Sequence, residues 1–113
     1  MKSNISKILF TGVNGQIGKN LLPKIAKLYG KESVIATDLN DQFSLAKSYN
    51  FSKLDVTNTK ELENIVKNEK VDCIIHLAGI LSSLSEKDRQ LAYRVNVESV
   101  NNIFELALKY KFR

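Results

Sequence analysis

Apolar and polar residues follow two different periods along this chain, and the two periods alternate. Short apolar runs predict buried β-strands, because a strand that is covered on both faces has no polar side. These runs lie at residues 7–11, 33–38, 50–56 and 72–78. Between them, apolar residues recur every three or four positions, which predicts amphipathic helices. The helical segments span residues 16–29, 58–68 and 86–110.

This alternation predicts an α/β protein. Each strand–helix–strand unit makes a right-handed crossover, so the strands lie parallel and helices cover both faces of the sheet. The chain has 113 residues, of which 43% are apolar and 26% charged, enough for one domain with a modest core. The sequence contains no repeat, low-complexity segment or linker that would divide residues 1–113 into two domains.

A glycine-rich turn follows the first strand and leads directly into a helix. Gly12, Gly15 and Gly18 leave three places where no side chain blocks the backbone. A helix N-terminus approached in this way is a site for a pyrophosphate. Because glycine turns also occur for packing alone, the triplet needs support from the rest of the sequence.

Asp38 supplies part of that support. It ends the second strand, where a dinucleotide-binding fold carries the carboxylate that accepts hydrogen bonds from the adenosine ribose. A carboxylate at this place repels a 2′-phosphate, and no arginine follows Asp38 to attract one. The sequence therefore favours NAD over NADP.

Two further strands end in residues that suit a nucleotide. Asp55 and Val56 end the third strand, and Leu77, Ala78 and Gly79 end the fourth. Because the carboxyl ends of parallel strands line one crevice, all of them are expected beside the glycine turn. Asp55 and the Val56 amide suit adenine, although a polar residue that only ends a strand is an equally good interpretation of Asp55. Small residues at 78 and 79 allow the backbone to lie against a cofactor.

Composition excludes several other classes of function. The net charge of +5 comes from dispersed lysines rather than from a basic run mixed with aromatic residues, so nucleic-acid binding is not expected. No apolar run approaches the length that crosses a bilayer, and a cytoplasmic protein without a membrane partner is expected. The single cysteine, Cys73, allows neither a disulfide within the chain nor a cysteine metal cluster. The single histidine, His76, lies in an apolar run and is interpreted as a hydrogen-bonded structural residue.

These features together resemble the extended short-chain dehydrogenases/reductases. The turn from Gly12 to Gly18 has that group's G-x-x-G-x-x-G spacing, and the segment from His76 to Gly79 is similar to its H-L-A-A segment. Within the group, the L-threonine 3-dehydrogenases of short-chain type are most similar, over nearly the whole chain. The similar segments lie at residues 14–18, 53–57, 79–82, 86–87, 90–93 and 96–97.

The resemblance implies a Rossmann-type doubly wound parallel sheet, with the four strands of this chain in the order 3-2-1-4. It also implies an oxidoreductase that uses NAD to convert L-threonine to 2-amino-3-oxobutyrate. Ser82 would contact the substrate, and no metal site is expected. The implied cofactor-binding residues are Gly12, Asn14, Gly15, Gln16, Ile17, Gly18, Asp38, Leu39, Asp55, Val56, Leu77, Ala78, Gly79 and Asn96.

The catalytic residues that the resemblance implies are not found in this sequence. A tyrosine that takes the hydroxyl proton, a lysine four positions later and a serine or threonine would follow a fifth strand, which would begin where the sequence stops, at Arg113. The one match to Tyr-x-x-x-Lys, Tyr49 to Lys53, is expected near the adenine end and outside any helix, so its side chains would not share a face. We therefore interpret residues 1–113 as an NAD-binding part without turnover of its own.

Truncation before the fifth strand has a physical consequence. The fourth strand would form a bare, apolar edge, which is prone to association. The long helix at residues 86–110 carries more apolar surface than one sheet face requires, and in the family it contributes to a two-fold dimer, so a homodimer through this helix is expected. Two alternatives stay open: a non-catalytic dinucleotide-binding module, and a fragment of an NAD-dependent sugar-nucleotide epimerase, which shares the glycine motif.

Overall fold

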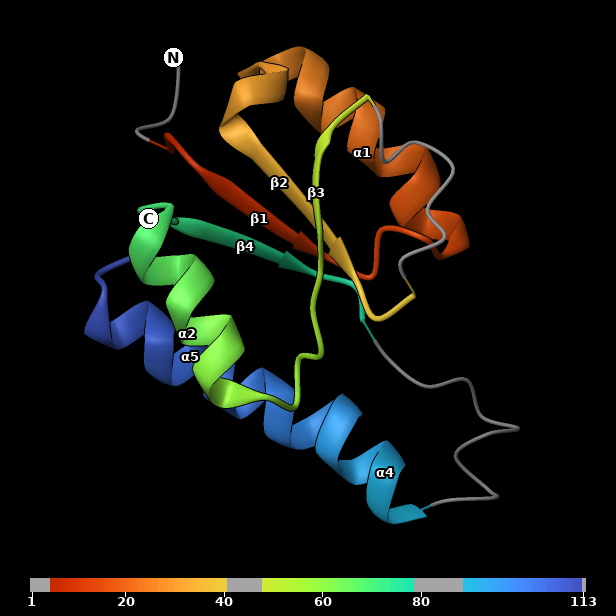
Figure 1. The fold of residues 1–113 in the computed structure, drawn as a ribbon, viewed down its shortest axis with the longest axis vertical. Coiled ribbons are helices and arrows are strands. Elements are labelled where there is room, and N and C mark those ends of the chain that lie inside the picture. The colour runs from red at the N-terminus through yellow and green to blue at the C-terminus, as the bar shows by residue number, and fades with distance from the viewer. Residues whose placement is uncertain (1–4, 41–47, 79–88, 113) are drawn as a thin grey trace.

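A four-stranded parallel sheet forms the centre of the computed structural model, which describes residues 5–40, 48–78 and 89–112 (Figure 1). The strand order is β3-β2-β1-β4, which confirms the predicted Rossmann-like topology. The strands are β1 (Ile8–Thr11), β2 (Val34–Asp38), β3 (Asn50–Lys53) and β4 (Cys73–His76). Three of them agree with the predicted runs to within two residues at each end, which is the usual uncertainty of strand limits.

The register of the sheet brings the strand ends level with one another. Thr11, the last residue of β1, lies opposite Thr37 of β2 on one side and His76 of β4 on the other. Asp38, the last residue of β2, lies opposite Lys53, the last residue of β3. Every segment that follows a strand therefore starts from the same edge of the sheet, which we call the carboxyl edge.

Helix α1 (Gln16–Tyr29) covers one face of the sheet. It ends at Gly30, which has a φ of 93° that a residue with a side chain rarely adopts. Its buried residues Leu22 and Ala26 join the side chains of β1 and β2 that point to this face, among them Phe10. A short 3-10 turn, η1 (Lys31–Ser33), then leads into β2.

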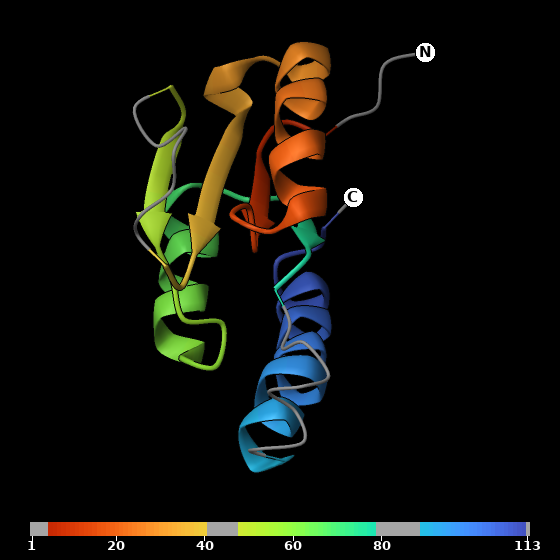
Figure 2. The same ribbon diagram turned by 90° about the vertical axis from the view of Figure 1, so that its right-hand side faces the viewer.

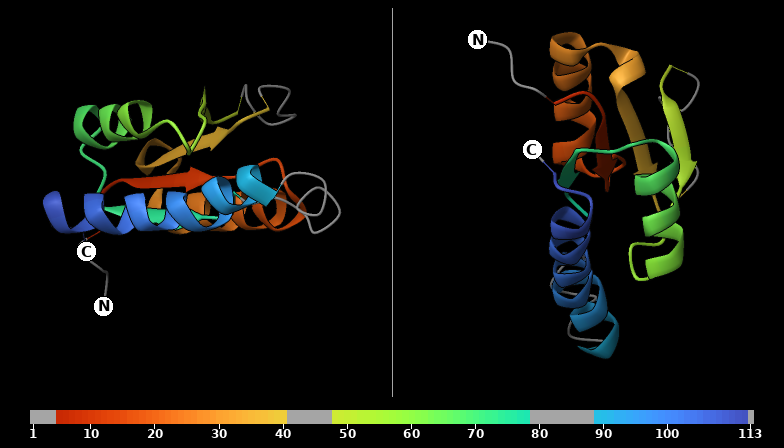
Figure 3. Two further views of the ribbon diagram at one scale, coloured as in Figure 1. Left: turned by 90° about the horizontal axis from the view of Figure 1, so that it is seen from below. Right: turned by 90° about the vertical axis from the view of Figure 1, so that its left-hand side faces the viewer.

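Helices α2 (Thr59–Asn68) and α5 (Ser99–Lys109) pack on the opposite face, against Leu9 and Ile35. Asn58 caps α2: its side-chain oxygen accepts the Glu61 N–H at 3.1 Å, and its side-chain amide donates to the Glu61 carboxylate at 3.0 Å. Helix α4 (Arg89–Tyr93) precedes α5 and extends past the end of the sheet (Figures 2 and 3).

Two predicted elements differ from the structure. The third strand ends at Lys53 rather than at Val56, because the chain turns at Asp55, whose carboxylate accepts the Thr57 N–H at 2.9 Å and the Thr57 hydroxyl at 2.6 Å. The long helix is also not α-helical throughout, since a π-helical stretch, η2 (Arg94–Glu98), joins α4 to α5, and the helix ends at Lys109. Such a stretch inserts a residue into the helical repeat and changes which side chains share a face.

Strand β4 forms one edge of the sheet, as expected for this part of the fold. All four of its residues are only half-buried, whereas all four of β1 are buried. Figure 1 shows β4 beside β1, with α2 and α5 together on one side of the molecule and α1 on the other.

Candidate functional site

The glycine turn between β1 and α1 is held firmly by the sheet. Val13 is fully buried, and its N–H donates to the Thr37 carbonyl oxygen at 3.2 Å, two residues beyond the last β1 residue that pairs with β2. The Gly15 N–H donates back to the Gly12 carbonyl oxygen at 3.3 Å, which closes the turn. The start of α1 is thereby fixed relative to two strands.

Two of the three glycines are required by the protein itself. A Cβ on Gly12 would lie 2.6 Å from the backbone of Leu77 and Ala78, and its φ of +73° is unfavourable for other residues. A Cβ on Gly18 would lie 2.6 Å from the Gly12 carbonyl oxygen, because α1 here packs directly on the turn. The fold alone explains these two.

Gly15 is different, because nothing in the described part of the chain demands it. A Cβ there would meet only the Gly12 carbonyl oxygen, at an ordinary contact distance of 3.5 Å, and the Gly15 φ of −75° suits any residue. Gly15 is exposed at the start of α1, and a side chain placed there would extend into open space. A glycine in this position keeps that space clear for a molecule that approaches the backbone closely.

That space is electrostatically suited to an anion. The first hydrogen bond of α1 is donated by Lys19 to the Gly15 carbonyl oxygen at 2.9 Å, so the preceding amides of Gln16, Ile17 and Gly18 come before the helical ladder. The first turn contains no acidic residue. These amides and the positive end of the helix dipole favour a phosphate group.

Asp38 lies beside this turn, as the sequence predicts. One oxygen of its carboxylate accepts the Asn14 N–H at 2.9 Å, and the other accepts the Asn40 N–H at 2.9 Å. The acid at the end of β2 is therefore already joined to the glycine turn by a charge-assisted hydrogen bond. Two large apolar side chains are exposed at the glycine turn and beside Asp38: Ile17 in the first turn of α1 (66%) and Leu39 (61%).

The end of β4 closes the other side of the turn. The Thr11 hydroxyl oxygen lies 3.1 Å from the Leu77 nitrogen and 3.3 Å from the Ala78 nitrogen, and accepts both N–H groups. The backbone of Leu77 and Ala78 thus lies against Gly12, which brings these two predicted residues to the site. Gly79 and Ser82 lie outside the described residues.

His76 has a hydrogen-bonded position, in agreement with its structural interpretation. Its Nδ1 lies 2.6 Å from the Thr11 hydroxyl, and its Nε2 lies 3.2 Å from the hydroxyl of Ser99. Desolvation by burial lowers the pKa of His76 below the ordinary 6.5, so the ring is neutral at neutral pH.

The other predicted cofactor-binding residues, Asp55, Val56 and Asn96, are less directly connected to the glycine turn. Asp55 and Val56 follow β3 at the carboxyl edge, but the Asp55 carboxylate holds the turn into α2, and the Val56 side chain is buried in the core. At this turn the backbone of Asp55 and Val56, rather than either side chain, is therefore suited to a ligand. Asn96 lies in the π-helical stretch and is exposed.

Tyr49 lies far from this edge and forms no catalytic pair with Lys53. It precedes β3 at the amino end of the strand, where Lys31 lies 5.4 Å from its ring centre, so the expected location near the adenine end is wrong. Lys53 ends the same strand, about 13 Å further along at the rise of a β-strand. The two side chains consequently lie at opposite edges of the sheet.

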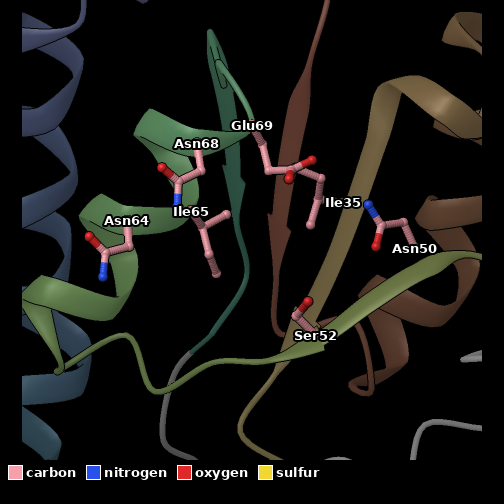
Figure 4. Close-up of a pocket in the computed structure, with 7 residues that line it drawn as sticks. All are labelled: Ile35, Asn50, Ser52, Asn64, Ile65, Asn68 and Glu69. Atoms are coloured by element: carbon pink, nitrogen blue, oxygen red, sulfur yellow. The ribbon is translucent and has the colours of Figure 1, made fainter.

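Two hollows lie away from the carboxyl edge. One, of about 150 Å³, lies between α2 and the start of β2 and β3, with Asn50, Asn64 and Asn68 around Ile35 and Ile65 (Figure 4). The other, of about 240 Å³, separates α2 from α5 beside Glu63 and Lys109, which form an ion pair at 2.6 Å. Neither is lined by residues of the glycine turn or by Asp38.

Within the residues that the structure describes, no group of three metal-ligating side chains exists, and no helix is long and apolar enough to cross a membrane. Burial, with a smaller contribution from Asp72, raises the pKa of the Cys73 thiol, so this cysteine is a poor nucleophile at neutral pH.

The fold and the turn define a dinucleotide-binding protein of Rossmann type: parallel strands in the order 3-2-1-4, three spaced glycines and an acid at the end of β2. The NAD dependent epimerase/dehydratase family model matches residues 8–113. The chain belongs to this family.

Individual relatives agree with this assignment. An uncharacterized epimerase/dehydratase of Staphylococcus saprophyticus is 36% identical over 111 residues, which are 96% of this chain and 35% of that protein. The structure of L-threonine dehydrogenase from Clostridium difficile matches with a TM-score of 0.89 and 34% identity, over 98% of this chain and 35% of that one. For L-threonine dehydrogenase from Phytophthora infestans the values are 0.86 and 35%, over 96% and 34%. The chain thus spans about a third of the length of these proteins.

Sequence reasoning missed two residues that organise the site, Thr11 and Ser99. Thr11 joins β1 to the end of β4, and Ser99 is fully buried where α5 meets His76. A hydroxyl residue immediately before the first glycine was the available signal for Thr11. Ser99 carried none, because its contact depends on how the helix crosses the sheet.

Proposed function

We propose that this chain is the NAD-binding portion of an L-threonine 3-dehydrogenase of short-chain type. The observation that carries the proposal is Gly15, which the described residues do not require and which keeps a space free in front of a helix N-terminus. The similarity to L-threonine dehydrogenases at 34% and 35% identity supports the choice of enzyme. The whole enzyme would oxidise L-threonine to 2-amino-3-oxobutyrate.

The residues at the carboxyl edge suit each part of NAD. The amides of Gln16, Ile17 and Gly18 would bind the pyrophosphate, and the Asp38 carboxylate would accept the hydroxyls of the adenosine ribose. Leu39 and the backbone at Asp55 and Val56 would contact adenine. The nicotinamide of NAD supplies the hydride acceptor. On the nicotinamide side, the backbone of Leu77 to Gly79 would lie along the cofactor, with Asn96 beside it and Ser82 at the substrate.

NAD is favoured over NADP by the surroundings of Asp38. The carboxylate already accepts two backbone N–H groups, which fix its orientation. A 2′-phosphate at the same place would meet that charge at short range. We expect NADP to bind at least tenfold more weakly than NAD, since one unfavourable charge contact costs about 1.4 kcal/mol or more.

The direct test is an NAD titration by calorimetry with two matched variants. Gly15→Val adds a side chain to the open space without a backbone clash, and should reduce NAD affinity at least tenfold while the far-UV circular dichroism is unchanged. Asn68→Val places valine at an exposed position at the end of α2, away from the glycine turn, and this variant should bind NAD like the wild type. Equal affinities for the two variants would refute the proposed phosphate site.

Turnover is a separate question, for which we propose that the chain alone has none. The Tyr49 and Lys53 side chains lie at opposite edges of the sheet, so they cannot act as a proton-transfer pair on one substrate. Threonine-dependent formation of NADH should stay at the background level. A rate that disappears in Tyr49→Phe would contradict this assignment.

A second candidate function is an NAD-dependent epimerase of the same family, which is favoured by the description of the Staphylococcus relative as an epimerase/dehydratase. Its cofactor site would be the same, so NAD binding cannot distinguish the two. Saturation-transfer NMR can: contact with L-threonine in the presence of NAD supports the dehydrogenase, and contact with a nucleoside-diphosphate sugar alone supports the epimerase.

Self-association is the last part of the proposal. Along the α4–η2–α5 helix, four large apolar residues are exposed: Tyr93, Val97, Phe104 and Leu108. Their spacing of four or seven residues keeps them close to one side of the helix, and a stripe of this kind marks a helix-to-helix interface. We expect a homodimer that Phe104→Lys dissociates, as measured by sedimentation. A wild-type chain that stays monomeric at high concentration would refute it.

A further inference from the structure

Three side chains from three different elements form one continuous hydrogen-bonded chain behind the glycine turn. Thr11 ends β1, His76 ends β4 and Ser99 begins α5. The Thr11 hydroxyl lies 2.6 Å from His76 Nδ1, and His76 Nε2 lies 3.2 Å from the Ser99 hydroxyl. Thr11 and Ser99 are both buried, where polar groups are normally hydrogen-bonded.

The positions of the hydrogens in the Thr11–His76–Ser99 network follow from counting its donors and acceptors. The Thr11 oxygen has two lone pairs and one hydrogen, and it already accepts the N–H groups of Leu77 and Ala78. The Leu77 N–H is shared with the Thr11 carbonyl oxygen, but with two donors already directed at the hydroxyl oxygen we infer that its short contact with His76 Nδ1, at 2.6 Å, is made by donating its hydrogen. An unprotonated Nδ1 in a neutral ring places the proton on Nε2, which then donates to Ser99.

We propose that His76, held as the Nε2–H tautomer, is a positioning residue for the cofactor edge. By accepting the Thr11 proton it orients the Thr11 lone pairs toward the Leu77 and Ala78 amides, and by donating to Ser99 it ties that edge to the first residue of α5. The proposal rests on the proposed function only in that Leu77 and Ala78 lie against NAD.

The position of Ser99 explains why the tie matters. The π-helical stretch ends at Glu98, immediately before Ser99, so the His76–Ser99 bond fixes the point at which the helix returns to α-helical geometry. The π-helical stretch, η2, also contains Asn96, which is a predicted cofactor contact. Loss of the bond would therefore disturb both the backbone at Ala78 and the orientation of the helix that carries Asn96.

The tautomer can be observed directly, because His76 is the only histidine in the chain. A protein without a histidine tag, labelled with ¹⁵N-histidine, gives one ring spectrum in long-range ¹H–¹⁵N NMR at neutral pH. We expect a protonated Nε2 and an unprotonated Nδ1, without NAD present. A protonated Nδ1, or an averaged signal from both tautomers, would overturn the proposal.

Variants test the positioning role. The Ala78 amide is the sharpest probe, since its hydrogen bond goes to the Thr11 side chain, whereas the Leu77 amide is also within 3.1 Å of the Thr11 carbonyl oxygen. Thr11→Val should accelerate hydrogen exchange at Ala78 about tenfold and weaken NAD binding by about threefold to tenfold, and Thr11→Ser should restore both. Because the Thr11 hydroxyl is the donor to Nδ1, Thr11→Val should also change the His76 ring spectrum toward a mixture of tautomers, whereas Ser99→Ala should shift the Nε2 signal.

The two proposals fail in distinguishable ways. If NAD does not bind to the wild-type chain, the proposed function fails, while the ring spectrum and the Ala78 exchange rates still decide the role of His76. If NAD binds but Thr11→Val and Ser99→Ala leave the ring spectrum, Ala78 exchange and NAD affinity unchanged, the positioning role is refuted and the cofactor site stands.

Discussion

Gly15 and Gly18 allow the demands of the fold to be separated from those of the ligand by adding a single methyl group at each. At Gly18 the new Cβ would lie 2.6 Å from the Gly12 carbonyl oxygen and 2.7 Å from the Val13 Cα. Both are backbone atoms that cannot rotate away. At Gly15 the new Cβ would have only one contact, at 3.5 Å. The same substitution therefore meets a clash at one site and open space at the other.

The expected magnitudes differ in the same way. Alanine in a helix gains about 1 kcal/mol over glycine, but overpacking against fixed atoms costs about 1–3 kcal/mol and sometimes more. Because the approach at Gly18 is to backbone, the clash should win, and Gly18→Ala should lose about 2 kcal/mol of unfolding free energy. Gly15→Ala lies at the helix N-cap, where exchanging glycine for alanine costs about 1 kcal/mol or less.

Urea unfolding followed by far-UV circular dichroism is the appropriate assay, since the chain has no tryptophan to report on its core. For a domain of this size, 2 kcal/mol corresponds to a fall in Tm of about 8 °C or more. NAD titration of the same samples completes the pattern: Gly15→Ala should lose affinity with little loss of stability. A Gly18→Ala protein as stable as the wild type, or a Gly15→Ala protein destabilised by more than about 2 kcal/mol, would refute the division of roles.

Three further predictions concern other parts of the molecule. Because burial lowers the pKa of His76 below 6.5 in the folded state, the unfolded state binds its proton first. Stability should therefore be complete above pH 6.5 and fall as the pH decreases through the folded pKa, as urea titrations from pH 7.5 to 5 can measure. A flat profile, or a profile that is retained by His76→Phe, would contradict this prediction. Asn58→Ala removes the cap of α2 and should lower the unfolding free energy by about 1 kcal/mol, whereas Asn64→Ala on the same helix serves as the exposed control. Asp38→Asn should weaken NAD binding about tenfold or more and reduce the preference over NADP, since a charged acceptor contributes about 1.5–3 kcal/mol, and an unchanged NAD/NADP ratio would exclude Asp38 as the ribose acceptor.

Local sequence signals were sufficient for most of the fold. The glycines and the apolar runs act over a few residues, and the structure has the turn, the strands and the helices that they predict. The limits of β3 were less accessible, because Asp55 could either continue the strand or turn the chain, and only its bonds to Thr57 decide. Contacts between a helix and the sheet could not be predicted from local patterns either, because their partners are far apart in sequence: Ser99 lies 23 residues from His76.

The π-helical stretch illustrates a further limit. The apolar spacing at residues 86–110 fits one continuous helix, and an inserted residue changes that spacing by an amount that a short amphipathic pattern does not reveal. The change in spacing becomes visible only from the contact between one residue of the helix and one residue of the sheet. Here those residues are Ser99 and His76.

The glycine turn is held to its two neighbouring strands by the protein's own contacts, and this has a consequence for how binding energy is used. Val13 is bonded to β2, Asn14 to Asp38, and Gly12 is packed against Leu77 and Ala78, so the turn touches both neighbouring strands through backbone atoms. A ligand therefore does not have to order the turn, and the entropy that a flexible loop would lose is not subtracted from its affinity. The Asn14–Asp38 bond adds a second effect, because it orients the carboxylate toward the turn at which the ribose and the pyrophosphate would meet. In the proposed NAD site, selectivity for the 2′-hydroxyl would then come from a carboxylate that two backbone N–H groups hold in place, rather than from a side chain that can turn away.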